Sequence, residues 1–404
     1  MTLVAVLLAG GTSSAWALTP LPVTPSPAPV ATPATPGADD NVVGGGQLGS
    51  LDTVVGSGTG VGALPTVTTA SFVLADATTG RVLASRAPHL KRPPASTLKA
   101  LTALTLIPRL EPQGTYKVAA VDTRVEGSRV GLVSGSTYTH DQLFTALFLP
   151  SANDAASALA RSRGSVSQTV RQMNDEAQRL QALDTVAKNP SGLDADGQVS
   201  SAYDLALIGR EGLNNPKFAG YAKLVRTTFP GKQPKRASQK RATFVIESQN
   251  RLLRDKYAGA IGVKTGFTSK AGRTYIGAAE RNGTRLIVTL MGNVEPTEIA
   301  ARRLLDWGFA NAGRVQTPVG TLVEPLGPAP TSDVDSASAD AASLGNDTDP
   351  ISASTSSASF GGSSAMLRWG VLIAAVLAAA GLIVLTYVGN GSLARRRIRR
   401  RYHR

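Results

Sequence analysis

The sequence predicts an α/β protein of the α+β type, in which a mostly antiparallel sheet is flanked by helices and joined to a helical lobe. Two hairpin signals carry this prediction: residues 70–75 and 81–85 flank a turn at 76–80, and residues 274–281 and 284–291 flank Asn282-Gly283. The residues between the hairpins show helical spacing. If the first hairpin pairs with the second, one sheet forms, the helical middle becomes a second lobe, and a cleft lies between them.

Apolar spacing and helix-ending residues place the other elements in chain order. A helix is predicted from near Ser96 to residue 106, a second over residues 143–149 with Pro150 as its stop, and a third from near Asp154. A short strand is expected at residues 260–263, and a closing helix follows Pro296. The helix predicted near residues 166–180 has five apolar residues at core-facing spacing: Val166, Val170, Met173, Ala177 and Leu180.

Composition divides the 404 residues into six regions. The prediction is a signal peptide at 1–17, a disordered leader at 18–65, a globular domain at 66–313, a flexible linker at 314–366, a transmembrane helix at 367–388 and a basic tail at 389–404. The first region is apolar and ends in Ala15-Trp16-Ala17, a pattern that signal peptidase cuts. The uncharged stretch Trp369 to Val388 has 20 residues, enough for a helix to cross a bilayer core of about 30 Å.

The charge distribution predicts the topology of this membrane protein. Seven arginines lie in the last ten residues and supply half of the net charge of +14. Short arginine-rich flanks stay in the cytoplasm, so we expect a single-pass protein of the cell membrane with its globular domain outside the cytoplasm. A basic tail beside a membrane helix does not require nucleic-acid binding. The absence of cysteine excludes disulfides, thiolate metal sites and a cysteine nucleophile.

Three short motifs carry candidate chemistry. In the first, Ser96 and Lys99 lie three residues apart, which places a hydroxyl and an amine on one face of a helix start. A serine hydroxyl must lose its proton to attack an amide, and a neutral lysine can take it. Lysine has an ordinary pKa of about 10.4, so the pKa of Lys99 must be lowered, and burial together with a second nearby cation, for which Lys264 is the candidate, would supply much of this shift. The other motifs are Ser151-Ala152-Asn153, between two predicted helices, and Lys264-Thr265-Gly266, at the end of the predicted strand.

The ordered set of three motifs resembles the penicillin-binding serine acyl transferases, which implies their β-lactamase/penicillin-binding transpeptidase-like fold. The longer context is similar to the low-molecular-mass D-alanyl-D-alanine carboxypeptidases, the low-molecular-mass penicillin-binding proteins of serine peptidase family S11, over about residues 70–309. Four segments carry this resemblance: residues 126–132, 151–156, 189–194 and 264–272.

This resemblance implies a role for each matching residue. Ser96 would be acylated, Lys99 would act as its base, and Ser151 would pass the proton to the leaving D-alanine. Asn153 would hold the substrate amide, and Lys264 with Thr265 would bind the terminal carboxylate. The backbone N–H groups of Ser96 and Phe267 would form the oxyanion hole, and Gly266 would let the substrate backbone approach the strand. The implied reaction removes the terminal D-alanine from peptidoglycan pentapeptide stems, with β-lactams as inhibitors and without metal or cofactor.

Two departures from the family pattern affect the substrate site. Ala152 replaces the glycine that the family usually has between the serine and the asparagine. The arginine that some members place shortly after the strand ending at Met291-Gly292, to hold the substrate carboxylate, has no clear counterpart in residues 293–296. Which arginine, if any, holds this carboxylate besides Lys264 and Thr265 therefore stays open.

Other functions stay open at this stage. A β-lactamase would need a carboxylate to activate water, for which Glu211 is the candidate. Endopeptidase or transpeptidase activity depends on cleft shape, and a non-catalytic wall-binding module belongs to a different class. The only histidines are His89, His140 and His403, so a zinc peptidase lacks a ligand cluster, and a Ser-His-Asp triad would depend on His89.

Overall fold

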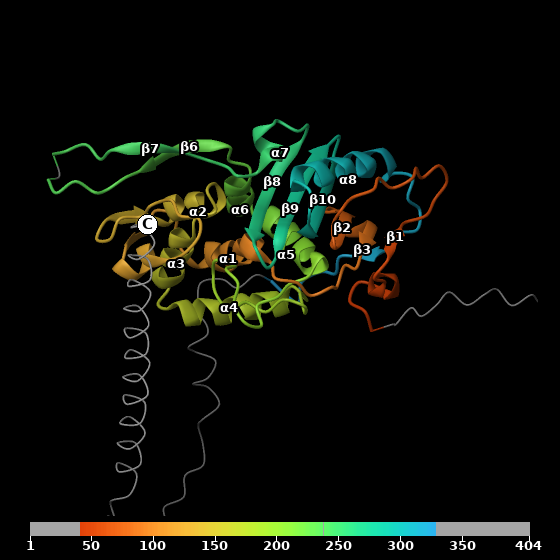
Figure 1. Cartoon of the computed structure of the whole chain (residues 1–404), viewed down its shortest axis with the longest axis horizontal. Helices are drawn as coiled ribbons and strands as arrows, with labels where there is room; N and C mark the ends of the chain where they lie inside the picture. Colours follow the sequence, from red (N-terminus) through yellow and green to blue (C-terminus); the bar gives the residue numbers. More distant parts are fainter. Residues whose placement is uncertain (1–40, 237, 329–404) are drawn as a thin grey trace, which may run out of the picture. The chain divides into compact units, whose positions relative to one another are not determined.

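The structure is a computed structural model that describes residues 41–236 and 238–328 (Figure 1). The predicted signal peptide, membrane span and basic tail lie outside the described residues. Within the described part, no helix is long and apolar enough to cross a membrane.

A seven-stranded sheet forms the centre of the described domain (Figure 1). Its strands are β1 (Thr53–Val55), β2 (Ser71–Asp76), β3 (Arg81–Arg86), β8 (Ala260–Thr268), β9 (Gly272–Arg281), β10 (Thr284–Asn293) and β11 (Gly320–Thr321). The order is β1-β3-β2-β10-β9-β8, β11 also pairs with β3, and every pair is antiparallel. The predicted union of the two hairpins is confirmed, because β2 pairs with β10.

The turn between β9 and β10 follows from its two residues. Asn282 has a φ of 49° and Gly283 a φ of 78°. A two-residue hairpin turn with both φ values positive matches the right-handed twist of the strands, and asparagine and glycine adopt it at low cost. This turn sets the register of β9 against β10, and thereby helps to place β8.

Both faces of the sheet are covered, because alternate side chains of each strand enter different cores. Phe72 and Leu74 of β2 pack in one core with α8 (Thr297–Asn311), the predicted closing helix. Val73 and Ala75 belong to the other core, which contains α5 (Ala202–Asn214) and the helical lobe. The sheet is therefore held between α8 on one face and α5 with the helical lobe on the other.

The helical lobe surrounds α1 (Lys99–Leu106), in which every residue is buried. Four further helices belong to this lobe: α2 (His140–Phe148), α3 (Asn153–Ser162), α4 (Val166–Arg179) and α6 (Pro216–Ala222). The small hairpin of β4 (Thr115–Lys117) with β5 (Thr137–Thr139) and the longer hairpin of β6 (Arg226–Pro230) with β7 (Thr243–Glu247) extend it, and α7 (Arg251–Arg254) leads back to β8. Short 3-10 helices occupy Gly46–Gly49, Ala95–Leu98, Ile107–Arg109 and Ala120–Arg124.

The folded domain begins earlier than predicted, because residues 41–65 are not disordered. Leu48 is buried in the main core, and β1 pairs with β3 along Thr53–Val55. This Gly- and Pro-rich segment shows little apolar periodicity, so its sequence gives no sign that it pairs with strands elsewhere in the chain.

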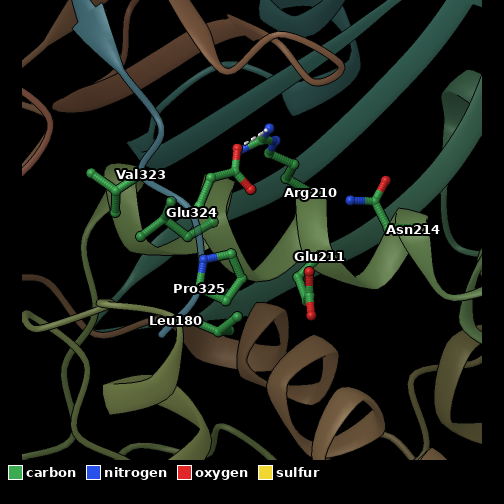
Figure 2. Close-up of a pocket in the computed structure, with 8 residues that line it drawn as sticks. Leu180, Arg210, Glu211, Asn214, Val323, Glu324 and Pro325 are labelled. Carbon is green, nitrogen blue, oxygen red and sulfur yellow. Dashed lines mark hydrogen bonds and ion pairs between the residues drawn. The ribbon is translucent and has the colours of Figure 1, made fainter. Parts of the chain in front are cut away.

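The folded domain also ends later than the predicted boundary at residue 313. Figure 2 shows Val323, Glu324 and Pro325 against α5, where Arg210 Nη2 lies 2.7 Å from Glu324 Oε1. The backbone N–H of Leu326 donates to the carbonyl of Arg179. The first part of the predicted linker, up to residue 328, therefore belongs to the fold.

Candidate active site

Ser96 and Lys99 meet at the start of α1, as their spacing predicts. Ser96 lies in the 3-10 turn Ala95–Leu98, and Lys99 opens the α-helix. Lys99 Nζ lies 2.9 Å from Ser96 Oγ. Lys99 is fully buried, whereas Ser96 is partly exposed. The nucleophile candidate can thus meet a substrate while its candidate base stays away from solvent.

Two further partners fix the Lys99 amine. Nζ donates to Asn153 Oδ1 at 2.6 Å and to the carbonyl of Ser191 at 2.6 Å. The Ser191 carbonyl can only accept a hydrogen bond. Asn153 presents its oxygen to Lys99 as well, because its Nδ2 donates to the carbonyl of Glu126 at 2.6 Å. A neutral amine has two N–H bonds, which these two acceptors use, so its lone pair points to the Ser96 hydroxyl.

A second serine–lysine pair faces the first across the site. Lys264 Nζ on β8 donates to Ser151 Oγ at 2.9 Å and to the carbonyl of Thr265 at 2.9 Å. Ser151 has a φ of 59°, a conformation that costs a non-glycine residue about 1–3 kcal/mol. This backbone turn between α2 and α3 places the hydroxyl next to the sheet, so Ser151 links the two lobes.

Burial sets the charge state of both lysines. The pKa of Lys99 lies well below its ordinary value because burial disfavours the charged form, and the positive charge of Lys264 adds to this effect against the opposing charge of Asp154. Burial also lowers the pKa of Lys264 to about 7. The conclusion from sequence that Lys99 needs burial and a second cation therefore agrees with the geometry.

Asp154, to which the sequence assigned only a helix start, organises the rim of the site. Its carboxylate accepts three backbone N–H bonds of the loop 126–132, from Val130 at 3.0 Å, Gly131 at 2.9 Å and Leu132 at 2.9 Å. The same loop supplies the Glu126 carbonyl that orients Asn153. These contacts explain why residues 126–132 accompany the Ser-x-Asn motif.

Two glycines allow backbone segments to approach the nucleophile turn. A Cβ on Gly266 would lie 2.3 Å from Thr274 Oγ1, 2.8 Å from Ser96 N and 2.9 Å from Thr97 N, so both the neighbouring strand and the nucleophile turn require this glycine. A Cβ on Gly192 would lie 1.9 Å from the carbonyl oxygen of Ala95. The role expected for Gly266 from the sequence, contact with substrate backbone, is thus joined by a structural one.

The motif Lys264-Thr265-Gly266 lies inside β8, which continues to Thr268, and not at the end of a strand at residue 263. A polar pocket of about 240 Å³ opens beside Thr265, Gly266 and the exposed side chain of Phe267. Arg273 lines the same pocket from β9, directly opposite Phe267, and its guanidinium lies 5.7 Å from the Phe267 ring centroid. Arg273 was not among the residues predicted for the site, although it directly follows the segment 264–272 that carries the family resemblance.

A second pocket lies on the Asn153 side of the site. It has a volume of about 280 Å³ and is lined partly by apolar side chains, Val125, Val166, Pro190 and Leu193, with Asn153 and Ser191 at its edge. The candidate residues therefore lie between a polar pocket beside β8 and a more apolar pocket beside α3 and the loop 189–193. This arrangement can receive an extended peptide with a charged end.

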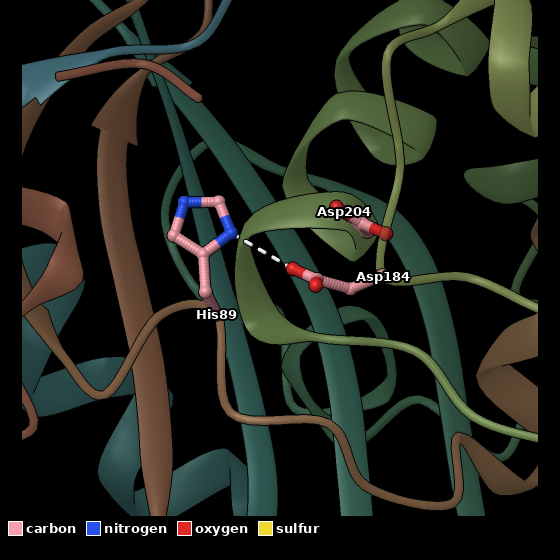
Figure 3. A group of neighbouring side chains, drawn as sticks. All are labelled: His89, Asp184 and Asp204. Atoms are coloured by element: carbon pink, nitrogen blue, oxygen red, sulfur yellow. Dashed lines mark hydrogen bonds and ion pairs between the residues drawn. The ribbon is translucent and has the colours of Figure 1, made fainter. Parts of the chain in front are cut away.

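The residues considered for rival reactions have other partners. Glu211 lies beside the docked C-terminal segment (Figure 2). It accepts a hydrogen bond from Arg179 at 2.8 Å, which gives it a structural contact in place of a water-activating one. Figure 3 shows His89 facing Asp184, with Nδ1 at 2.8 Å from the carboxylate, and Nε2 contacts the Val43 carbonyl at 3.0 Å. Both ring nitrogens are therefore engaged, and the hydroxyl of Ser96 has Lys99 as its partner.

The three groups in Figure 3 are close enough to suggest a metal site, but their hydrogen bonds indicate that they hold the N-terminal segment on the domain. His89, Asp184 and Asp204 have ligand atoms within 4.8 Å of one another. Asp204 accepts a hydrogen bond from the Thr185 hydroxyl at 2.7 Å, and burial raises the pKa of Asp204 to about 7. His89 links the N-terminal segment at Val43 to Asp184, so it helps to hold residues 41–49 on the domain.

Fold and site together define a serine-dependent acyl-transfer enzyme with a penicillin-binding-protein-like α/β fold. The family model described as D-alanyl-D-alanine carboxypeptidase, peptidase family S11, matches residues 59–295. The chain belongs to this family and is a serine-type D-Ala-D-Ala carboxypeptidase.

Individual relatives agree with this family. The chain is 40% identical over 259 residues to the D-alanyl-D-alanine carboxypeptidase DacB2 of Mycobacterium tuberculosis, a match that covers 62% of this chain and 85% of DacB2. It is 34% identical over 267 residues to DacD of Escherichia coli, with 62% of this chain and 66% of DacD covered. It therefore spans slightly less than two thirds of DacD.

Solved structures show the same fold. A crystal structure of a D-alanyl-D-alanine carboxypeptidase from Mycobacterium tuberculosis superimposes with a TM-score of 0.60 and 37% identity, over 66% of this chain and 99% of that one. The DD-transpeptidase of Streptomyces K15 gives a TM-score of 0.58 and 27% identity, over 62% of this chain and 100% of that one.

Proposed function

We propose that this enzyme removes the terminal D-alanine from pentapeptide stems of peptidoglycan through an acyl-enzyme on Ser96. The observation that carries the proposal is the hydrogen bond between Ser96 and a fully buried Lys99 whose two other partners are acceptors. This arrangement favours a neutral amine with its lone pair at the nucleophile. The names of the relatives, D-alanyl-D-alanine carboxypeptidases, supply the substrate class.

The reaction has two steps. Ser96 Oγ attacks the carbonyl of the penultimate D-alanine while Lys99 takes its proton, and the amide bond to the terminal D-alanine breaks as Ser151 passes a proton to the leaving amine. Water then attacks the ester, and Ser96 regains its proton. The backbone N–H groups of Ser96 and Phe267 are our candidates for stabilising the oxyanion in both steps.

The substrate carboxylate fits the polar pocket beside β8. Thr265 lines this pocket, the buried Lys264 precedes it on β8, and Arg273 adds a cation where the sequence left a gap. In the part of the chain that the structure describes, no carboxylate forms an ion pair with Arg273. We infer that Arg273 is available to pair with the substrate anion.

We further propose that the enzyme acts outside the cytoplasm, anchored to the cell membrane by one C-terminal helix. The sequence supports this topology through the export signal at 1–17, the 20 uncharged residues from Trp369 to Val388 and the seven arginines that follow them.

A transpeptidase reaction is the second candidate, and the DD-transpeptidase of Streptomyces K15 supports it as a relative of the same fold. Both reactions share the acyl-enzyme and differ in the acceptor, which is water in one and an amine in the other. Product analysis therefore separates them.

The test is mass analysis of a stem pentapeptide incubated with the enzyme, with and without an amine acceptor. Loss of one alanine supports the carboxypeptidase, a product extended by the acceptor supports the transpeptidase, and an unchanged peptide contradicts both. Labelling by a fluorescent penicillin should disappear in Ser96→Ala. It should persist in Ser269→Ala, a matched control at an exposed serine.

A further inference from the structure

A strongly basic surface lies outside the active site, on the hairpin of β6 and β7. From Arg226 to Ile246 the sequence contains no Asp or Glu, and its cations are Arg226, Lys232, Lys235, Arg236, Lys240 and Arg241. In Figure 1 this hairpin, in green, extends past α2 with its connecting loop at the outer end. We call the four exposed cations of that loop, Lys232, Lys235, Arg236 and Lys240, the hairpin tip.

The charges of the hairpin tip are not neutralised within the described domain. The ion pairs of this hairpin lie at its base, where Glu247 is 3.8 Å from Arg226 and 3.9 Å from Arg254. Over residues 41–236 and 238–328, no carboxylate lies within ion-pair distance of the four tip cations. A concentration of like charges on a protruding loop creates a positive potential that attracts an anionic partner.

The base of the loop is held in place, so the tip is presented and does not lie against the body. Arg241 donates to the carbonyls of Gly231 and Thr137, each at 2.8 Å, and its guanidinium lies 4.5 Å from the Tyr138 ring centroid. Gln233 exchanges hydrogen bonds with Thr137 and Ser136 of the helical lobe. Arg241 therefore serves the fold, whereas the four tip cations have no such contacts.

Apolar side chains accompany these charges. Phe244 and Val245 of β7 are 41% and 50% exposed on the strand that leads away from the tip, and Val225, 41% exposed, lies at the base of the hairpin. Cations beside exposed aromatic and aliphatic groups are typical of segments that lie in the interface of a bilayer. A soluble acidic polymer would satisfy the cations but would leave the apolar groups in water.

We propose that the hairpin tip is a docking surface for anionic lipid headgroups of the membrane that carries the enzyme. The occupant follows from charge complementarity and from the exposed apolar side chains Phe244 and Val245 on the same hairpin. It also follows from the proposed membrane anchor: the composition of residues 329–366 predicts a flexible tether of about 35 Å that can stretch considerably further, so the bilayer is within reach of the domain although the tether does not hold the domain against it. This docking proposal rests on the proposed membrane anchor, so the experiments measure membrane binding by the anchor and by the hairpin tip separately.

The chain lacks cysteine, which makes a local probe possible. A fluorophore is attached at Ser238→Cys in the full-length protein, with Thr79→Cys in the β2–β3 turn as the labelling control, and quenching by lipids with a spin-labelled headgroup is measured. Vesicles of phosphatidylcholine alone are compared with vesicles that also contain phosphatidylglycerol. We expect quenching at position 238 only in the anionic vesicles, with loss at high salt, and no quenching at position 79.

Charge-neutral variants test the residues themselves. The variant K232Q/K235Q/R236Q/K240Q should weaken the affinity of the tip for anionic vesicles roughly 600-fold and so abolish the quenching, because each of the four basic residues contributes about fivefold to affinity for an anionic surface. The matched control K188Q/K217Q/K256Q/K270Q removes the same charge from exposed lysines elsewhere and should keep the signal.

Flotation with neutral vesicles measures membrane binding by the anchor alone, because these vesicles offer no anionic headgroup to the hairpin tip. If the chain does not float, the proposed anchor is wrong, and the tip is then tested by flotation of wild type against the quadruple variant with anionic vesicles. Equal quenching at position 238 in neutral and anionic vesicles would overturn the docking proposal. So would a tip that binds soluble polyglycerol phosphate but leaves position 238 unquenched by lipid.

Discussion

Lys264 should reduce the stability of the domain at neutral pH, so Lys264→Met should stabilise it. Its folded-state pKa of about 7 lies below the ordinary 10.5. The unfolded chain therefore binds more protons than the folded one between these values, and stability rises with pH in that window. A pKa shift of this size lowers the free energy of unfolding by about 4 kcal/mol at pH 7 and by about 2 kcal/mol at pH 9.

The substitution also removes two hydrogen bonds, to Ser151 Oγ and the Thr265 carbonyl, worth about 1 kcal/mol each. We therefore expect the free energy of unfolding of Lys264→Met to exceed that of wild type by about 2 kcal/mol at pH 7 and to equal it at about pH 9. Urea denaturation of residues 41–328, followed by tryptophan fluorescence from pH 6.5 to 9.5, measures this difference. Lys256→Met, at an exposed lysine, should show no such trend.

The pH dependence of acylation in Lys264→Met provides a second test. Removal of the Lys264 charge should raise the pKa of Lys99, so the pH at which penicillin acylation reaches half its maximum should move upward. A variant less stable than wild type at pH 7, or a stability difference that does not change with pH, would refute the view that Lys264 is a desolvated cation.

Three further predictions concern the surroundings of the site. In Gly266→Ala the new Cβ would lie 2.3 Å from Thr274 Oγ1 and press on the nucleophile turn, so penicillin acylation should fall about 100-fold, measured by stopped-flow labelling. Arg273→Gln should raise KM for a peptide with a free carboxylate about tenfold or more and leave an amidated peptide unaffected, with Lys270→Gln as control; equal effects on both peptides would remove Arg273 from the anion site. Glu211→Gln should leave the lifetime of the penicilloyl-enzyme unchanged, and a longer lifetime would instead favour a water-activating role.

The sequence predicts the parts of the fold that local patterns encode. The Asn282-Gly283 turn specifies a hairpin by its own backbone preference. Met173 and Ala177 of α4 and Leu180 at its C-cap are buried as their spacing predicts, whereas Val166 and Val170 are half-buried. The 3-10 turn before Lys99 was not predicted, although the candidate helix start was. Local rules thus succeed wherever the partner is close in the sequence.

The remaining features depend on contacts between distant segments. The Ser191 carbonyl reaches Lys99 across 92 positions, and backbone carbonyls carry no sequence signal. The pairing of β1 with β3 is equally hidden, because three residues of an edge strand show no periodicity. The resemblance to a known family marked residues 189–194 as important, but only the structure shows that one of their carbonyls orients the amine.

The arrangement of the two lysines explains why the site must lie between two lobes. Each lysine needs burial to lower its pKa, and each needs hydrogen-bond acceptors that an apolar core does not supply. Lys99 obtains them from Asn153 and Ser191 in the helical lobe, whereas Lys264 on β8 obtains one from Ser151, which the helical lobe supplies. Separation of the lobes would expose both amines and restore their ordinary pKa values, so the contact between sheet and lobe that protects the site also keeps its base able to accept a proton.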